Sequence, residues 1–195
     1  MVVEPLPDRG LILISGPSRG GKSGWAEHLA AGWPGSVAYL ATGQAAAADP
    51  AWAERVRRHQ LRRPGSWQVA EVGADLVEHL EERAAGTARE PGPPRLLLID
   101  SLGTWIAWHL EEEAELWRRR CGQLQVALAA QPAPVLLVVE ETGWGVVPST
   151  AIGGLFRDRL GALQQELMAN CHTAWLVVAG RALNLTALGV PAPAI

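Results

Sequence analysis

An apolar run that ends in a glycine-rich turn constrains the fold of this chain more than any other feature. Residues 11–14 (LILI) form a short continuous apolar stretch, which is typical of a strand buried in a parallel sheet. Residues 16–23 follow with the sequence GPSRGGKS, and residues 23–31 have a helical composition. A strand, a glycine-rich turn and a helix in this order predict a loop whose backbone N–H groups and helix N-terminus face a polyphosphate.

The turn fits the pattern G-x-x-x-x-G-K-[ST] of phosphate loops. The residues expected to contact a nucleotide here are Gly16, Pro17, Ser18, Arg19, Gly20, Gly21, Lys22 and Ser23. In such a loop Lys22 reaches the β/γ-phosphates and acts in catalysis, while the Ser23 hydroxyl binds Mg²⁺. An accidental match in a glycine-rich turn is disfavoured, because a strand is expected before the turn and a helix after it.

The use of lysine supports the same assignment. Seventeen side chains are lysine or arginine, and Lys22 is the only lysine among them. An ammonium is a compact point charge, whereas a guanidinium is a planar fork. The one exception to an arginine composition therefore falls at the position where a polyphosphate needs a point charge.

The bulk composition excludes several classes of protein. With 195 residues, 48% of them hydrophobic, the chain suits one domain, and we expect residues 1–195 to form it with an ordered core of about residues 10–188. A net charge of −3 argues against a nucleic-acid-binding protein built on a basic surface. Cys121 and Cys171 are too few for a disulfide framework. No stretch approaches the roughly 18 apolar residues of a membrane span, so we expect a cytoplasmic protein.

Apolar runs and helical segments alternate along the chain, which predicts βαβ units and a mostly parallel sheet flanked by helices. Strands are expected over residues 11–14, 37–41, 67–71, 96–99, 135–139 and 175–178. Helices are expected over residues 23–31, 50–63, 74–85, 102–130 and 154–169. The fourth of these helices is long, and a break is expected near Gly103 or Gly122. With the phosphate loop, this pattern predicts an α/β domain of the RecA-like P-loop NTPase class.

A phosphate loop also needs an acidic residue near Mg²⁺. Asp100 closes the apolar run of residues 96–99 and is the natural candidate, because ligands bind at the carboxyl ends of strands in open α/β sheets. An aspartate at a strand end can instead cap the next helix. Glu140 and Glu141, which end another buried strand, are rival candidates for the metal.

Four blocks of sequence together resemble one known family. Residues 55–71 (RVRRHQLRRPGSWQVAE) fit R-[IV]-x-x-H-x-x-x-R-P-x-x-W-x-x-x-E, and residues 39–42 (YLAT), 141–148 (ETGWGVVP) and 156–161 (FRDRLG) fit three further blocks. In order and spacing they resemble the bifunctional adenosylcobinamide kinase / adenosylcobinamide-phosphate guanylyltransferase family of cobalamin biosynthesis. The resemblance extends over about residues 11–185.

The resemblance implies two reactions on one scaffold. A nucleoside triphosphate, ATP or GTP, first phosphorylates the aminopropanol hydroxyl of adenosylcobinamide. GTP then gives its GMP to that phosphate through a GMP–histidine intermediate, and the matching histidine is His59. The other nucleotide contacts that the resemblance implies are Ala41, Thr42, Gly43, Gln60, Leu61, Arg62, Arg63, Glu71 and Asp100. It also implies a corrinoid substrate, Mg²⁺ bound by Ser23 and Asp100, and a homotrimer.

The surroundings of His59 suit a nucleophile. A neutral imidazole is nucleophilic near pH 7 and can later leave, so a phosphoramidate can form and transfer its nucleotide. The five arginines around it favour phosphate and disfavour imidazolium: Arg55, Arg57, Arg58, Arg62 and Arg63. From its charge alone the segment could also be a solvated basic helix face or an RNA-binding patch. For the whole chain, two alternatives are a monofunctional P-loop kinase of a small alcohol and a nucleotide-regulated binding module.

The chain departs from the family pattern at several positions. Gln60 and Leu61 follow the histidine where the family has a basic and then an acidic residue. Glu140 stands where many members have asparagine, and residues 151–154 (AIGG) replace a segment that commonly carries arginines. These departures concern the contacts to guanine and to the corrinoid. They leave Lys22 and His59 unaffected.

Overall fold

The computed structural model describes residues 5–43, 63–87, 95–145 and 149–192. Its strands are β1 (Gly10–Gly16), β2 (Val37–Ala41), β3 (Gln68–Glu71), β4 (Leu96–Asp100), β5 (Pro134–Glu140), β6 (Thr173–Val178) and β7 (Arg181–Asn184). Its helices are α1 (Lys22–Ala31), α3 (Leu76–Thr87), α4 (Leu102–Trp108), α5 (Ala114–Ala129), α6 (Ala151–Asn170) and α7 (Leu185–Leu188). The helix expected over residues 50–63 falls, apart from its last residue, outside the described residues.

The strands form one seven-stranded sheet in the order β3-β2-β4-β5-β1-β6-β7. Every neighbouring pair is parallel except β6 and β7, which are antiparallel. The predicted mostly parallel sheet is therefore confirmed, and each expected strand is present within two residues of its expected bounds. Because the parallel strands share one direction, their carboxyl ends lie along a single edge of the sheet.

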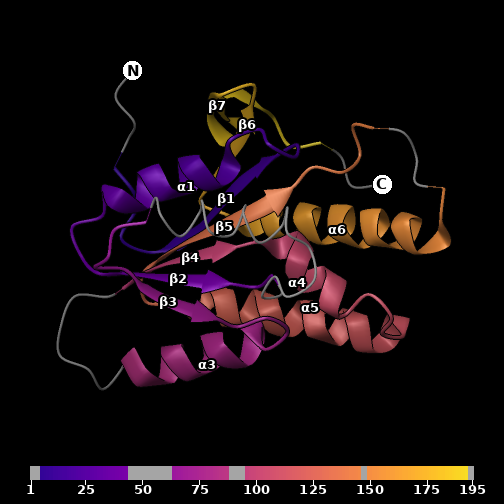
Figure 1. The fold of residues 1–195 in the computed structure, drawn as a ribbon, viewed down its shortest axis with the longest axis horizontal. Helices are drawn as coiled ribbons and strands as arrows, with labels where there is room; N and C mark the ends of the chain where they lie inside the picture. The colour runs from indigo at the N-terminus through magenta and orange to yellow at the C-terminus, as the bar shows by residue number, and fades with distance from the viewer. Residues whose placement is uncertain (1–4, 44–62, 88–94, 146–148, 193–195) are drawn as a thin grey trace.

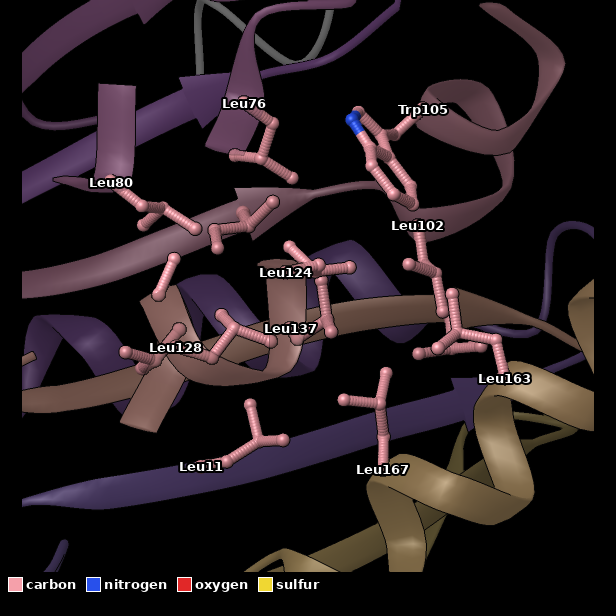
Figure 2. Close-up of a cluster of buried hydrophobic side chains, with 14 of the residues drawn as sticks. Leu11, Leu76, Leu80, Leu102, Trp105, Leu124, Leu128, Leu137, Leu163 and Leu167 are labelled. Carbon is pink, nitrogen blue, oxygen red and sulfur yellow. The ribbon is translucent and has the colours of Figure 1, made fainter. Parts of the chain in front are cut away.

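Both faces of the sheet are buried along its inner strands β1, β2, β4 and β5, whose side chains alternate between the faces and are almost all buried. One face packs against α3, α4, α5 and α6, and the other packs against α1. Figure 2 shows how leucines of α3, α5 and α6 converge with Trp105 of α4 on Leu11 of β1 and Leu137 of β5. This core fixes the strands, and with them the edge at which the phosphate loop lies.

The prediction of one long helix over residues 102–130 is wrong in one respect. The segment forms two helices, and the break lies at residues 109–113 rather than at Gly103 or Gly122. The Arg159 guanidinium of α6 donates to the backbone carbonyls of His109, Leu110 and Glu112. These bonds satisfy carbonyl groups that a helix end leaves unpaired, so the chain turns where a residue fifty positions later stabilises the turn.

The chain ends in a hairpin strand and a short helix, β7 and α7, which the sequence patterns do not predict. No helix within the described ranges combines the length and the apolar character that crossing a membrane requires.

A phosphate loop and two carboxylates at the carboxyl edge of the sheet

The phosphate loop leaves β1 and enters α1 through backbone positions that require glycine. Gly16 has φ +150° and Gly21, the N-cap of α1, has φ +106°. A Cβ at Gly16 would lie 3.1 Å from the carbonyl carbon of Val177 and closer still to its oxygen, because β6 passes directly behind the loop. The loop therefore has the tight backbone path that the sequence pattern predicts.

Lys22 lies inside this loop. Only 7% of its surface is exposed, and its Nζ donates to the carbonyl oxygen of Pro17 at 2.9 Å. The Gly20 N–H donates to the same carbonyl at 3.1 Å, so the Pro17 carbonyl accepts hydrogen bonds from both the Lys22 ammonium and the Gly20 amide. Ser23 follows in the first turn of α1, and Ser18 and Arg19 are exposed at the tip of the loop. The loop thus gathers a cation, a hydroxyl and the N-terminus of a ten-residue helix at one place.

The strand register brings acidic residues to the same edge. Gly16 of β1 is paired with Glu140 of β5, and Ala41 of β2 is paired with both Asp100 of β4 and Glu71 of β3. Asp100 and Glu140 end strands that are direct neighbours, whereas Glu71 is exposed at the outer strand of the sheet. Two carboxylates therefore lie between the phosphate loop and β2.

Asp100 is held from the neighbouring strand. The Tyr39 hydroxyl donates to its Oδ2 at 2.8 Å, and the Arg63 guanidinium lies 3.4 Å above the centre of the Tyr39 ring. Burial and the Asp100 carboxylate raise the pKa of the Tyr39 phenol far above its ordinary value of 10.0, so the phenol keeps its proton. Asp100 does not cap the next helix, because Ser101 is the N-cap of α4.

Glu140 has a different role from Asp100. Its carboxylate accepts hydrogen bonds from the Ser101 hydroxyl and from the Gly103 N–H at the start of α4, the second at 2.9 Å. Burial raises its pKa above 4.5, and the Asp100 carboxylate acts in the same direction, whereas its hydrogen bonds and the charge of Lys22 oppose the shift. Glu141 accepts from Gln164 at 2.6 Å. Of the three rival carboxylates, Asp100 is the one bound through a single oxygen to a tyrosine.

Thr42 connects the ends of β2 and β4. Its side chain is fully buried, and its hydroxyl is bonded to the Ser101 backbone and to the Thr104 hydroxyl. The Trp108 indole donates to the Thr42 carbonyl at 2.8 Å. The Thr42 side chain therefore fixes the turn after Asp100. The Thr42 N–H donates to the Asp100 carbonyl at 3.1 Å, and none of the residue's surface is exposed to a nucleotide.

The predicted histidine site is only partly described. His59, Gln60, Leu61 and Arg62 lie outside the described residues, so their roles remain predictions. Arg63 is described and lies over Tyr39. Sequence patterns did not single out Tyr39, Ser101 or Gly103 as part of the site, although Tyr39 belongs to a block that carries the family resemblance.

The oxygen donors of the site suit Mg²⁺ bound together with a nucleotide. In the described part of the chain, no three His, Cys, Asp or Glu side chains gather as a metal site. Mg²⁺ in nucleotide sites needs no such cage, because it keeps waters and uses one or two protein oxygens with the phosphates. The Ser23 hydroxyl and the Asp100 carboxylate are hard oxygen donors of this kind, so the residues present fit the ion.

Comparison with known proteins identifies the family. The model of the family described as cobinamide kinase / cobinamide phosphate guanyltransferase matches residues 12–185, which include the loop, both carboxylates and the segment around position 59. The chain belongs to this family. Two curated relatives are the bifunctional adenosylcobalamin biosynthesis proteins CobU of Salmonella typhimurium and CobP of Pseudomonas aeruginosa. They are 33% and 35% identical over 87% and 89% of this chain, and over 96% and 95% of their own lengths.

Family membership makes the chain a bifunctional enzyme, a cobinamide kinase and cobinamide phosphate guanylyltransferase. Solved structures agree with the P-loop fold. The ATPase of a bacterial type III secretion system has a TM-score of 0.57 at 12% identity, over 93% of this chain and 59% of its own. A Pyrococcus horikoshii protein has a TM-score of 0.59 at 6% identity, over 93% and 88%. At these identities the likeness shows the fold alone, and it supports the predicted RecA-like P-loop class.

Proposed function

We propose that the chain carries out both reactions of its family at the edge formed by the phosphate loop and Asp100, with adenosylcobinamide and then its phosphate as acceptor. The observation that carries the proposal is the geometry of the loop, in which Lys22 is buried at the start of α1 within a family match of residues 12–185. ATP or GTP serves the first reaction, and GTP serves the second.

In the kinase reaction the loop holds the triphosphate. The backbone N–H groups at the start of α1 and the Lys22 ammonium bind phosphate oxygens, and they stabilise the charge that develops on the transferred group. Ser23 and Asp100 would hold Mg²⁺, which neutralises charge on the β- and γ-phosphates when bound. The corrinoid hydroxyl attacks the γ-phosphorus, its proton passes to solvent, and the nucleoside diphosphate leaves.

In the guanylyl reaction we assign His59 as the nucleophile. Its imidazole nitrogen bonds to the α-phosphorus of GTP as the bond to pyrophosphate breaks. A phosphate oxygen of adenosylcobinamide phosphate then attacks the same phosphorus, the P–N bond breaks, and the imidazole returns to its first state. Arginines are suited to hold the phosphates during both steps, and Arg63 lies over the ring of Tyr39, whose hydroxyl donates to Asp100.

The test is covalent labelling with GTP that carries ³²P at the α-phosphate. Wild type should acquire an acid-labile, base-stable label, and His59→Asn should acquire none. His172→Asn is the matched control, because His172 is exposed and lies outside the site; it should label like wild type. A label that survives in His59→Asn would refute the assignment. No label in wild type would leave the kinase as the one remaining activity. If GTP-dependent phosphorylation of adenosylcobinamide were also absent, the result would favour a nucleotide-regulated binding module.

We also propose that the protein is a cytoplasmic homotrimer, as the family resemblance implies. Light scattering coupled to gel filtration measures this directly. A mass near three times 20.8 kDa supports the trimer, and a mass near one or two chains contradicts it.

A further inference from the structure

We propose that Tyr39 is a positioning residue for both reactions: its phenol holds the Asp100 carboxylate in the orientation that binds the metal–nucleotide, and Arg63 holds the phenol. This inference rests on the proposed function, because it takes Asp100 as the carboxylate that binds the metal. It assigns a role to a residue that touches neither substrate.

The strand register explains why a tyrosine stands at this position. Tyr39 is paired with Leu98, and Ala41 is paired with Asp100, so the tyrosine starts two residues before the carboxylate on the same face of the sheet. Two residues of strand span about 6.6 Å. A phenol that leans along the strand covers this distance and delivers its hydroxyl to Oδ2 at 2.8 Å. A serine or threonine at position 39 would be too short to reach it.

The hydrogen bond fixes the carboxylate at one oxygen. Tyr39 is only 2% exposed, so its hydroxyl has little access to water and depends on Asp100 as acceptor. The bond occupies Oδ2 and restricts rotation of the carboxylate, which favours Oδ1 for a cation. Partners of this kind, which hold a metal ligand without touching the metal, typically change metal affinity or activity about 10- to 100-fold when they are lost.

Arg63 completes the arrangement from the other side of the ring. Its guanidinium lies 3.4 Å from the ring centre, a cation–π contact. Its Nε is buried and has no hydrogen-bond partner among the described residues, so the ring face is the contact that accommodates this part of the cation. The positive charge makes the hydroxyl a stronger donor toward Asp100. Because Arg63 follows His59 by four positions, the contact links the segment of the nucleophile to the carboxylate of the phosphate site.

Tyr39→Phe separates positioning from packing, because it keeps the ring under Arg63 and removes only the hydroxyl. We expect the Mg²⁺ concentration for half-saturation of GTP binding and of ³²P labelling to rise about 10- to 100-fold, with most of the labelling rate restored at high Mg²⁺. Ser15→Ala is the matched control: it removes a buried hydroxyl of β1 that has no hydrogen-bond partner in the described part of the chain. The Mg²⁺ concentration for half-saturation of Ser15→Ala should equal that of wild type.

A spectroscopic measurement uses the fact that Tyr39 is the only tyrosine in the chain. Protein labelled with ¹³C at tyrosine Cζ should give one resonance. With a non-hydrolysable GTP analogue bound, this resonance should shift when Mg²⁺ is added and broaden when Mn²⁺ replaces it. This readout needs no variant, so it remains decisive if Tyr39→Phe fails to fold.

The two proposals fail in different ways. Failure of the proposed function would appear in wild type as the absence of GTP binding or of Mg²⁺ dependence. The inference about Tyr39 is overturned when wild type binds Mg²⁺ and GTP but Tyr39→Phe reaches half-saturation at the same Mg²⁺ concentration. It is also overturned when, with the nucleotide bound, the tyrosine resonance neither shifts with Mg²⁺ nor broadens with Mn²⁺.

Discussion

Replacement of Gly103 by alanine tests the contact between α4 and the carboxylate of Glu140. A Cβ at Gly103 would lie 2.9 Å from Glu140 Cδ and closer still to Oε2, and 3.4 Å from Phe156 Cζ. The carboxylate would have to move away, and it would lose the bond that it accepts from the Gly103 N–H. Gly122, inside α5, is the matched control because a Cβ there meets no atom within 4 Å.

The expected magnitudes follow from these contacts. Alanine in place of glycine stabilises a helix by about 1 kcal/mol, which should be the whole effect at Gly122. At Gly103 the same gain is offset by the loss of a hydrogen bond to a charged acceptor, which is worth about 1.5–3 kcal/mol, and by a buried carboxylate left partly unsatisfied. We therefore expect Gly103→Ala to destabilise the protein by about 1–2 kcal/mol and Gly122→Ala to stabilise it by about 1 kcal/mol.

Urea unfolding at pH 7.5, followed by tryptophan fluorescence, measures both changes. For a chain of this length, 1 kcal/mol corresponds to a melting-temperature shift of about 2–4 °C, so thermal unfolding gives a second measurement. Adding Glu140→Asn, which shortens the side chain by one methylene, should recover part of the loss in Gly103→Ala. Equal stabilisation by both alanines would refute the contact, and so would no recovery in the double variant.

Three further outcomes follow from the structure. Gly16→Ala should abolish GTP binding in a titration and cost about 2 kcal/mol or more, since its Cβ meets the Val177 carbonyl at a φ of +150°; retained binding would contradict the loop geometry. Leu137→Ala, fully buried in β5, should cost about 2–5 kcal/mol in urea unfolding, and a cost below 1 kcal/mol would argue against the core. Burial opposes ionisation of Glu112, but Arg120 and His109 outweigh it and hold its pKa below 4.5. Its stabilisation should therefore be present above pH 4.5 and decrease as pH falls further. Wild type and Glu112→Gln should differ by about 1 kcal/mol at pH 7, and the difference should shrink as pH falls below 4.5.

Local patterns in the sequence predict the parts of the molecule that local physics decides. An apolar run predicts the strand at residues 11–14, and a segment of helical composition predicts α1. The glycines between them predict the phosphate loop, and Gly16 and Gly21 do adopt positive φ there. The parallel strands follow from their continuous apolar runs. The family blocks add the enzyme class, because they cover most of the chain.

Contacts between distant positions explain what the patterns miss. The break between α4 and α5 depends on Arg159, which has no signature near residues 109–113. Asp100 and Glu140 differ as candidate metal ligands because their hydrogen-bond partners differ. Asp100 accepts from Tyr39, 61 residues away, and Glu140 accepts from Gly103 at the start of α4, 37 residues away. Apolar runs reveal that a strand exists but do not reveal which strand lies beside it. The site therefore becomes specific only when the order of the strands in the sheet is known.

The central claim is that Lys22 holds the phosphates of the nucleotide, and the sequence allows a direct measurement because Lys22 is the only lysine. Protein labelled with ¹³C at lysine Cε should give one resonance, from a side chain that donates to the Pro17 carbonyl. GTP with Mg²⁺ should shift this resonance as the ammonium exchanges that carbonyl for phosphate oxygens, whereas guanosine should leave it in place. An unmoved resonance at GTP concentrations that saturate binding, with binding followed by tryptophan fluorescence, would contradict the claim.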